Sequence, residues 1–199
     1  MVYLISRALA VLLAKILFRI KVRGKKNIPQ KGSFILASNH LSYLDPGLVG
    51  VACPRKLNYM ARHDLFSNPL FSWWLYKVGV FPVKRESIDS SALKEAIRYL
   101  KNGNPLLVFP EGTRGTEGSF LEPQPGIGFL ATKADVPVIP AFVKGSSRAL
   151  AKGAKFIRLH KISVYFGQQI FIERRMPYQE IAQKIMESIR QLSSCEGLS

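Results

Sequence analysis

A histidine and an aspartate five positions apart, His40 and Asp45, are the residues whose types and spacing best suit catalysis. The apolar run 34–37 before them predicts a short buried strand, and Asp45-Pro46 predicts a helix start, because Asp is a favoured N-cap and Pro a favoured first helical residue. Along one continuous helix the two side chains would point about 140° apart, whereas in a strand-to-helix loop they can meet. The carboxylate would then fix the imidazole tautomer and leave the other ring nitrogen as a general base. The alternative is a helix cap beside an ordinary loop histidine.

Size and composition set the class of protein. The 199 residues suit one domain with a sizeable core, and 47% hydrophobic residues exclude a disordered chain. Cys53 and Cys195 are far apart and fit no metal-ligand spacing or disulfide framework, so a reducing environment is the simplest interpretation.

Charge is concentrated at one end of the chain. The net charge is +16, and residues 1–44 contribute +8 of it, with no Asp or Glu among them. Such a basic segment favours a polyanionic partner, either nucleic acid or an anionic membrane.

The first 20 residues favour the membrane and argue against nucleic acid. They are mostly apolar, and Arg7, Lys15 and Arg19 fall on one helical stripe. The longest charge-free stretch, 8–14, is far shorter than the roughly 20 residues that cross a bilayer. We therefore expect residues 1–26 to form an amphipathic membrane-interface helix and a basic connector, followed by a single domain at 27–199. The alternative is an amphipathic helix that packs on its own domain.

Apolar runs and helical patterns alternate along the remaining chain, which predicts an α/β fold with a largely parallel central sheet flanked by helices. An aromatic-rich helix at 66–78 suits either the core or a second membrane contact. Residues 21–31 are expected to form a connector, and 144–155 a mobile basic loop. Predicted strands occupy 34–37, 56–61, 80–83, 105–109, 138–143 and 162–166; further helices occupy 46–52, 89–102, 126–134 and 178–192.

Three loops should meet at one edge of this sheet, because each follows the carboxyl end of a parallel strand. In such sheets ligands bind beyond these ends. One loop carries His40, a second Arg85 and a third the run from Glu111 to Arg114. The two arginines offer planar cations suited to phosphate, and Gly112 lets backbone amides approach an anion. Glu111 could bond a hydroxyl, hold an arginine, or pair with Arg114 across the turn. A base beside a phosphate site on a membrane-bound domain suggests a phosphorylated lipid with a free hydroxyl.

Four ordered blocks give the chain a family resemblance. They are 39–45 (NHLSYLD), 79–85 (GVFPVKR), 109–114 (FPEGTR) and 136–140 (VPVIP). Together they span about half of the chain, and it resembles the glycerolipid acyltransferases, the 1-acylglycerol-3-phosphate acyltransferase family.

The resemblance implies transfer of a fatty acyl group from acyl-CoA or an acyl carrier protein (acyl-ACP) to the sn-2 hydroxyl of lysophosphatidic acid, giving phosphatidic acid. It implies no covalent intermediate, no metal and no cofactor, backbone amides that stabilise the oxyanion, and a peripheral or monotopic location on the cytoplasmic face of the cell membrane. By the same resemblance, His40 would be the base and Asp45 would orient it. The residues of the phosphate site would be Arg85, Glu111, Gly112, Thr113 and Arg114.

One departure concerns the acceptor. Family members often carry a lysine shortly after the third block, where this chain has Gln124, and a neutral amide attracts phosphate less. Another lysolipid or an acylated amino-acid lipid is therefore an alternative acceptor. An alternative of another class is a non-catalytic basic module that binds membrane or nucleic acid. His63 and His160 match no block and are predicted to be ordinary histidines.

Overall fold

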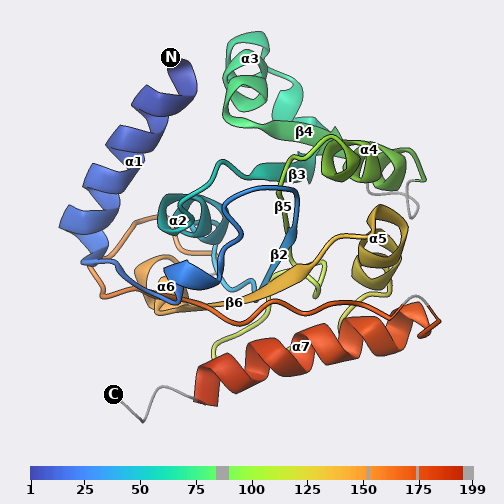
Figure 1. The fold of residues 1–199 in the computed structure, drawn as a ribbon. Helices are drawn as coiled ribbons and strands as arrows, with labels where there is room; N and C mark the ends of the chain where they lie inside the picture. The colour runs from blue at the N-terminus through green and yellow to red at the C-terminus, as the bar shows by residue number, and fades with distance from the viewer. Residues whose placement is uncertain (84–89, 152, 174, 195–199) are drawn as a thin grey trace.

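A seven-stranded mixed sheet organises the chain in the computed structural model, which describes residues 1–83, 90–151, 153–173 and 175–194 (Figure 1). The strand order is β1-β7-β6-β2-β5-β3-β4. The strands are β1 (Lys21–Arg23), β2 (Ile35–Ser38), β3 (Asn58–Arg62), β4 (Val80–Val83), β5 (Leu106–Val108), β6 (Val138–Lys144) and β7 (Ser163–Phe166).

Seven α-helices and two short 3₁₀ helices accompany the sheet in the described residues. They are α1 (Val2–Phe18), η1 (Lys25–Asn27), α2 (Asp45–Ala52), η2 (His63–Phe66), α3 (Pro69–Val78), α4 (Ser90–Lys101), α5 (Gly126–Ala134), α6 (Ser146–Ala149) and α7 (Tyr178–Ser194). The predicted α/β class is confirmed, and β4 and α5 have the bounds expected from sequence.

The two faces of the sheet have separate cores. One core joins α1, α2 and α6 to the sheet, and the other joins α4, α5 and α7 to it. The three isoleucines Ile181, Ile185 and Ile189 lie on one face of α7 and are fully buried. Burial of these apolar faces is the main term that stabilises the three-layer arrangement.

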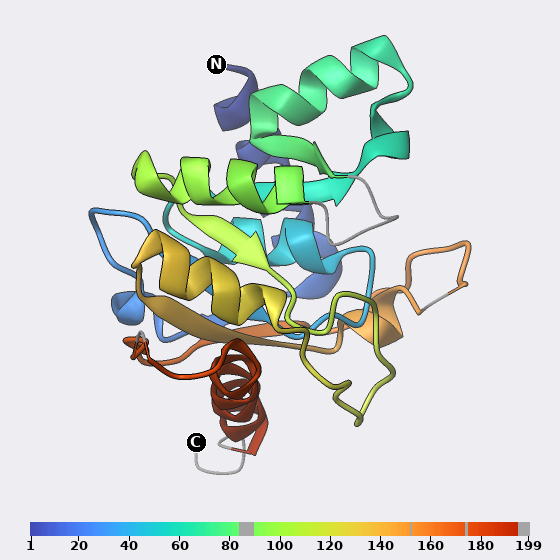
Figure 2. The same ribbon diagram turned by 90° about the vertical axis from the view of Figure 1, so that its right-hand side faces the viewer.

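Most strand pairs are parallel, and this places the loops. β6, β2, β5, β3 and β4 run in one direction, while β7 is antiparallel to β6. The carboxyl ends of β2, β4 and β5 therefore lie at the same edge of the sheet. In Figure 2 the loop after β5 and the segment around α6 extend to the side of the molecule toward which the β5 arrow points.

Two segments differ from the expectations. Lys21–Arg23, expected in a connector, forms β1 and pairs in parallel with β7. Within the expected loop 144–155, α6 follows Gly145, whose φ of 84° turns the chain, and Ser146 is fully buried. Both elements are too short to show a periodic pattern, and distant contacts hold them in place.

Helix α1 forms as predicted, but its charges do not all face away from the protein. The Arg7 guanidinium donates from Nη2 to the carbonyl of Cys53 at 2.8 Å, at the carboxyl end of α2. Ala14 and Phe18 are buried in the core. None of the helices in the described part of the chain has the length and hydrophobicity that crossing a bilayer requires.

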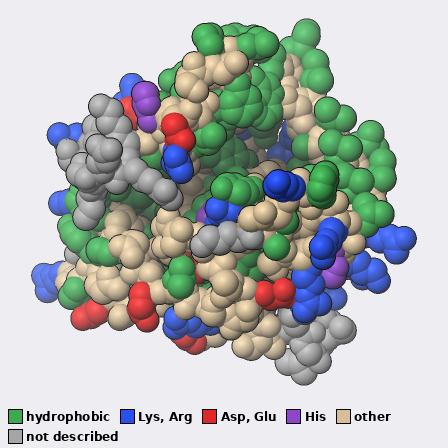
Figure 3. All heavy atoms as spheres, turned by 180° about the vertical axis from the view of Figure 1, so that it is seen from behind, with side chains coloured by type: hydrophobic (Ala, Val, Ile, Leu, Met, Phe, Trp, Pro, Cys, Tyr) green, Lys and Arg blue, Asp and Glu red, His purple; other side chains and the backbone are tan. Residues whose placement is uncertain are grey.

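Exposed hydrophobic side chains gather on α1 and α3. Trp74 of α3 donates from Nε1 to Ser6 Oγ of α1 at 3.1 Å, so the two helices form one α1–α3 layer. Figure 3 shows hydrophobic side chains around a hollow on one face of the molecule. The exposed large side chains of the layer are Leu4, Ile5, Leu9, Leu12, Leu13, Ile16, Leu70, Phe71, Trp73, Trp74 and Tyr76.

Candidate active site

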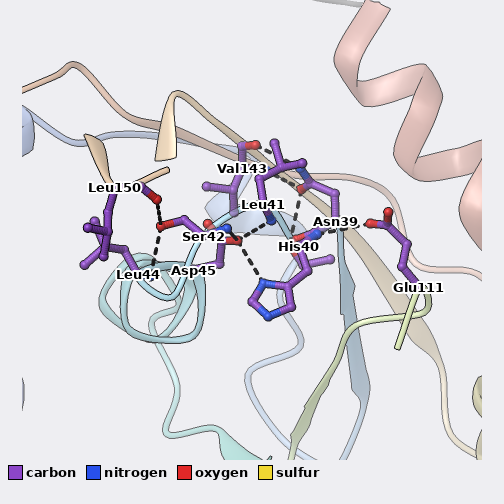
Figure 4. A network of polar contacts seen from close by, with 10 residues as sticks. Asn39, His40, Leu41, Ser42, Leu44, Asp45, Glu111, Val143 and Leu150 are labelled. Atoms are coloured by element: carbon purple, nitrogen blue, oxygen red, sulfur yellow. Dashed lines mark hydrogen bonds and ion pairs between the residues drawn. The ribbon is translucent and has the colours of Figure 1, made fainter. Parts of the chain in front are cut away.

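The catalytic loop, residues 39–45, connects β2 to α2 and brings the predicted base and carboxylate together. His40 Nδ1 lies 2.9 Å from Asp45 Oδ2, and the Asp45 side chain is fully buried (Figure 4). Asp45 is the first residue of α2 rather than its N-cap, which is Leu44. The loop between them lets the two side chains converge, as the spacing predicted.

Asp45 also fixes the loop backbone. Its Oδ2 accepts hydrogen bonds from the amides of Leu41 at 2.6 Å and Ser42 at 2.7 Å. An ionised carboxylate only accepts, so the His40 Nδ1 that faces it carries the proton. The other ring nitrogen, Nε2, is then left with a lone pair that can take a proton from a substrate.

Side-chain contacts on both sides hold the loop in place. Asn39 extends the β2–β6 pairing, because its side chain accepts from the Val143 amide at 2.7 Å and donates to the Val143 carbonyl at 3.0 Å. Ser42 Oγ donates to the carbonyl of Leu150 at 2.8 Å, just after α6. The short helix that sequence did not predict is therefore one support of the catalytic loop.

The imidazole is packed as well as hydrogen-bonded. Its ring stacks on Phe109, at the end of β5, with centroids 4.0 Å apart and planes 17° apart. The His40 side chain is 17% exposed, so one part of the ring remains open to a ligand. Stacking and the Asp45 bond together restrict the ring orientation that proton transfer needs.

Glu111, predicted to bind phosphate, is turned inward and bonds backbone amides. Oε1 accepts from the His40 amide at 3.1 Å and Oε2 from the Leu121 amide at 3.0 Å. Only 3% of the residue is exposed, and this burial raises the pKa of its carboxyl, although the two amide bonds oppose the shift. Gly115 N in turn donates to the His40 carbonyl at 2.8 Å. Glu111 thus ties the loop after β5 to the catalytic loop rather than pairing with Arg114.

Arg114 is held over the catalytic loop by an aromatic ring. Its guanidinium carbon lies 3.5 Å from the centroid of the Tyr43 ring. Its Nη1 is buried and has no hydrogen-bond partner in the described residues. An oriented cation with an unused donor suits a phosphate, which accepts charge-assisted bonds from arginine. Sequence reasoning missed Tyr43, although it lies inside the first block; only the tertiary contact shows its role.

Gly112 and Thr113 form the exposed part of the turn before Arg114. Gly112 has φ 67°, which glycine adopts readily, and a Cβ there would lie 3.4 Å from Gln124 Cγ. Gln124 is thus beside the predicted phosphate turn, where a family lysine would add charge. Arg85 lies outside the described residues; β4, which ends at Val83, runs parallel to β3 and reaches the same edge.

An apolar pocket of about 410 Å³ opens beside this site. It lies between α1, α2, β3 and α3, and Tyr43 is part of its wall. Its size falls in the range of small-molecule sites. The Tyr43 ring therefore contacts a cation and also lines a cavity that can hold a hydrocarbon chain. Among the described residues no group of three or more His, Cys, Asp or Glu side chains is arranged as a metal site.

Together these features describe an α/β protein with an oriented imidazole base, a nearby arginine and an apolar pocket. Comparison with known proteins agrees. The Acyltransferase family model matches residues 19–144. The chain is 32% identical over 152 residues to a 1-acyl-sn-glycerol-3-phosphate acyltransferase of Bacillus subtilis, spanning 76% of this chain and 73% of that one.

Other relatives are longer. A 1-acyl-sn-glycerol-3-phosphate acyltransferase of Streptococcus pneumoniae is 31% identical over 72% of this chain and 52% of its own length. The fold matches the crystal structure of the 1-acyl-sn-glycerophosphate acyltransferase PlsC of Thermotoga maritima with a TM-score of 0.81 at 24% identity, over 97% of this chain and 81% of that one. The chain belongs to the Acyltransferase family.

Proposed function

We propose that the protein transfers a fatty acyl group from a thioester to the sn-2 hydroxyl of 1-acylglycerol-3-phosphate, giving phosphatidic acid for phospholipid synthesis. The observation that carries this proposal is the grouping of the His40–Asp45 pair, the Arg114 guanidinium and the apolar pocket around one tyrosine ring. A lysophosphatidic acid has the matching parts: a free hydroxyl, a phosphate and an acyl chain. The B. subtilis and S. pneumoniae relatives support this choice of acceptor.

The geometry supports direct transfer. His40 Nε2 takes the proton of the acceptor hydroxyl, and the oxygen attacks the thioester carbonyl carbon. Asp45, fully buried and bonded to Nδ1, stabilises the imidazolium that forms. The intermediate then collapses: the new C–O bond remains, the C–S bond breaks, and the imidazolium gives its proton to the departing thiolate.

The acceptor's phosphate is placed by the turn that follows β5. Arg114 offers a buried donor that has no partner among the described residues, and the exposed Gly112–Thr113 turn offers backbone amides. Glu111 acts behind them through the backbone of the catalytic loop. Arg85, the last residue of the second block, is proposed to complete the phosphate site.

We also propose that the α1–α3 layer rests on an anionic phospholipid membrane, at the cytoplasmic face of the cell membrane. The layer exposes Leu and Ile side chains on α1 and two Trp side chains on α3. Trp prefers the membrane interface, and a basic segment attracts anionic headgroups. The apolar pocket lies under the same layer, so a lipid substrate would enter from the membrane side.

Product analysis by mass spectrometry tests the reaction. The purified protein is incubated with an acyl thioester and a panel containing lysophosphatidic acid, other lysophospholipids and an acylated amino-acid lipid. We expect phosphatidic acid to be the main product. Preferential acylation of another member of the panel, to which the neutral Gln124 beside Gly112 would point, overturns the acceptor assignment.

A further inference from the structure

The segment that joins α6 to β7 exposes hydrophobic and basic side chains in one short stretch. We call residues 153–161 the apolar–basic loop. Phe156 and Leu159 are 81% and 76% exposed, and Ile157 is more than half exposed. Three basic side chains are interspersed with them and are exposed as well; they are Lys155, Arg158 and Lys161. A group of exposed large hydrophobic side chains bordered by polar ones is typical of an interaction site.

The positive charge of this loop is not offset by neighbouring acidic groups. Residues 136–172 contain no Asp or Glu. Among the described residues, no acidic side chain forms an ion pair with any of the three basic residues of the loop. Glu117, in the segment after β5, pairs instead with Arg148 of α6 at 2.9 Å. The apolar–basic loop therefore favours a partner that is anionic as well as apolar.

Hydrogen bonds on both sides place the loop between the active site and helix α1. On one side, the Arg158 amide donates to the carbonyl of Ala149 at 2.8 Å. The next carbonyl, that of Leu150, accepts from Ser42 Oγ of the catalytic loop at 2.8 Å. On the other side, the amide of the buried Ile162 donates to the carbonyl of the last residue of α1 at 3.0 Å. The segment thus runs from a support of the catalytic loop to the last turn of α1.

The exposed hydrophobic surface of α1 extends to the end at which the loop arrives. Leu12, Leu13 and Ile16, in the last two turns of the helix, are all exposed. Figure 3 shows Lys and Arg side chains gathering on the right-hand side of that face, with hydrophobic side chains directly above them. In Figure 2 the segment after α6 projects on the side toward which the β5 arrow points, the edge that carries the catalytic loop. The loop therefore continues the proposed membrane surface of α1 toward the active site.

This combination of side chains suits a lipid surface better than a protein surface. Aromatic and aliphatic side chains enter the boundary between headgroups and acyl chains, while Lys and Arg remain with the anionic headgroups. A protein partner, such as an acidic acyl carrier protein, needs roughly 800 Å² of surface on each side. Three hydrophobic side chains in a nine-residue segment provide less than that. The side chains of the loop therefore favour an anionic bilayer as the partner.

We propose that the apolar–basic loop is a second membrane contact, separate from the α1–α3 layer, whose Phe156 and Leu159 enter the headgroup region of an anionic bilayer. This inference rests on the proposed membrane association and adds a further site to it. Because Leu150 accepts a hydrogen bond from Ser42 of the catalytic loop, a loop bound to the bilayer holds the active-site edge at the lipid surface. The acceptor lysolipid then reaches His40 directly from the bilayer.

A fluorescent label tests insertion of the loop without any reaction. The environment-sensitive dye NBD is attached to Phe156→Cys or, as a matched control, to Phe171→Cys, with Cys195 replaced by serine in both. Cys53 is buried and does not compete for the label. The control residue is also an exposed phenylalanine, but it follows the bridge to the first residue of β6, at the opposite edge of the sheet.

Anionic vesicles should raise the emission from position 156 by about twofold or more and shift it to shorter wavelength, whereas the emission from position 171 should change little. Unchanged emission from position 156, in a labelled protein that floats with the vesicles, would overturn the proposal. If the parent itself does not float with anionic vesicles, the membrane assignment of the α1–α3 layer fails together with this inference.

Flotation of the double variant Phe156→Ser/Leu159→Ser measures what the loop contributes to binding. We expect the variant to bind vesicles about tenfold or more weakly, since both changes remove apolar surface that the bilayer would bury, and Phe171→Ser to bind as the parent does. Its kcat with a soluble lysophosphatidic acid should equal that of the parent, because neither residue lines the apolar pocket or belongs to the catalytic loop. A double variant that floats as the parent does, but has a raised KM for acyl-ACP, would assign the loop to the carrier protein and overturn the lipid partner.

Discussion

The catalytic loop and the α1–α3 layer differ in what their side chains contact: those of the loop bond other groups of the protein, whereas many of those in the layer are exposed. In the loop, Asp45 and Asn39 are buried and bond groups of the protein itself, and Glu111 does the same from the loop after β5. In the layer, Ile5 and Leu9 are more than half exposed. Apart from Asp45 Oδ1, which has no hydrogen-bond partner in the described residues, these loop groups are paired within the chain, whereas the layer leaves hydrophobic side chains exposed. Variants should separate these regions: changes in the loop should impair chemistry, and changes in the layer should impair membrane binding.

The largest expected effect is on chemistry. Asp45→Asn should lower kcat by about 10²–10⁴-fold, because the imidazole loses both its tautomer restraint and the charge that stabilises it. Rates measured with a soluble lysophosphatidic acid check this, with Asp64→Asn, at an exposed ion pair with Arg62, as the control. Vesicle binding should not change. A variant that keeps a third or more of the parent's kcat would show that the carboxylate only holds the loop backbone.

Changes in the α1–α3 layer should impair membrane binding rather than chemistry. Ile5, Leu9 and Leu12 are 62%, 56% and 54% exposed. Replacing all three by serine should weaken vesicle binding by about a hundredfold, since each removes apolar surface that the bilayer would bury. Flotation with anionic vesicles measures the effect, and Phe171→Ser, an equally exposed site on another part of the surface, is the control. If flotation of the triple variant matches that of the parent, the layer is not the membrane contact.

Tyr43 contacts Arg114 and also lines the apolar pocket under the α1–α3 layer. We therefore expect its replacement to have an effect of intermediate size. Tyr43→Leu should raise KM for lysophosphatidic acid by about tenfold, because the ring that holds the Arg114 guanidinium is lost. Tyr43→Phe keeps the aromatic face and should restore the parent's KM. Initial rates at varied acceptor concentration decide this. Equal KM values for the leucine and phenylalanine variants would show that the cation–ring contact does not contribute to binding of the acceptor.

The smallest effect concerns stability against pH. Burial raises the pKa of Glu111 in the folded chain, so the folded state keeps this proton to higher pH than the unfolded state does. The contribution of Glu111 to the free energy of unfolding is therefore most favourable below the ordinary glutamate pKa of about 4.3, and it falls as pH rises through the raised pKa. Glu111→Gln should make the free energy of unfolding less dependent on pH in this range.

Urea unfolding of Glu111→Gln and the parent at several pH values measures the difference, with the exposed Glu122→Gln as the control. Parallel curves for Glu111→Gln and the parent would mean that the buried carboxyl does not titrate differently in the two states.

Local patterns were sufficient for the catalytic pair and for most of the sheet. His40 and Asp45 lie in one loop whose two ends are set by an apolar run and by Asp45-Pro46, so their meeting could be predicted. The Tyr43–Arg114 contact could not, since 71 positions separate the two residues and only the parallel β2–β5 pairing brings their loops together.

The elements that sequence missed depend on distant contacts for the same reason. β1 has three residues and is held by β7, about 140 positions away. α6 has four residues and follows a glycine with positive φ. Glu111 was assigned to the correct loop but to a different task, because its two backbone partners, His40 and Leu121, come from different segments.

The most direct test of the central claim is the rate at which His40→Ala transfers an acyl group to lysophosphatidic acid, beside a His63→Ala control in η2. We expect the folded His40→Ala protein to bind vesicles but to turn over at least about a hundredfold more slowly than the parent, while His63→Ala retains the parent's rate. A His40→Ala protein that acylates lysophosphatidic acid as fast as the parent would contradict the assignment of this imidazole as the base.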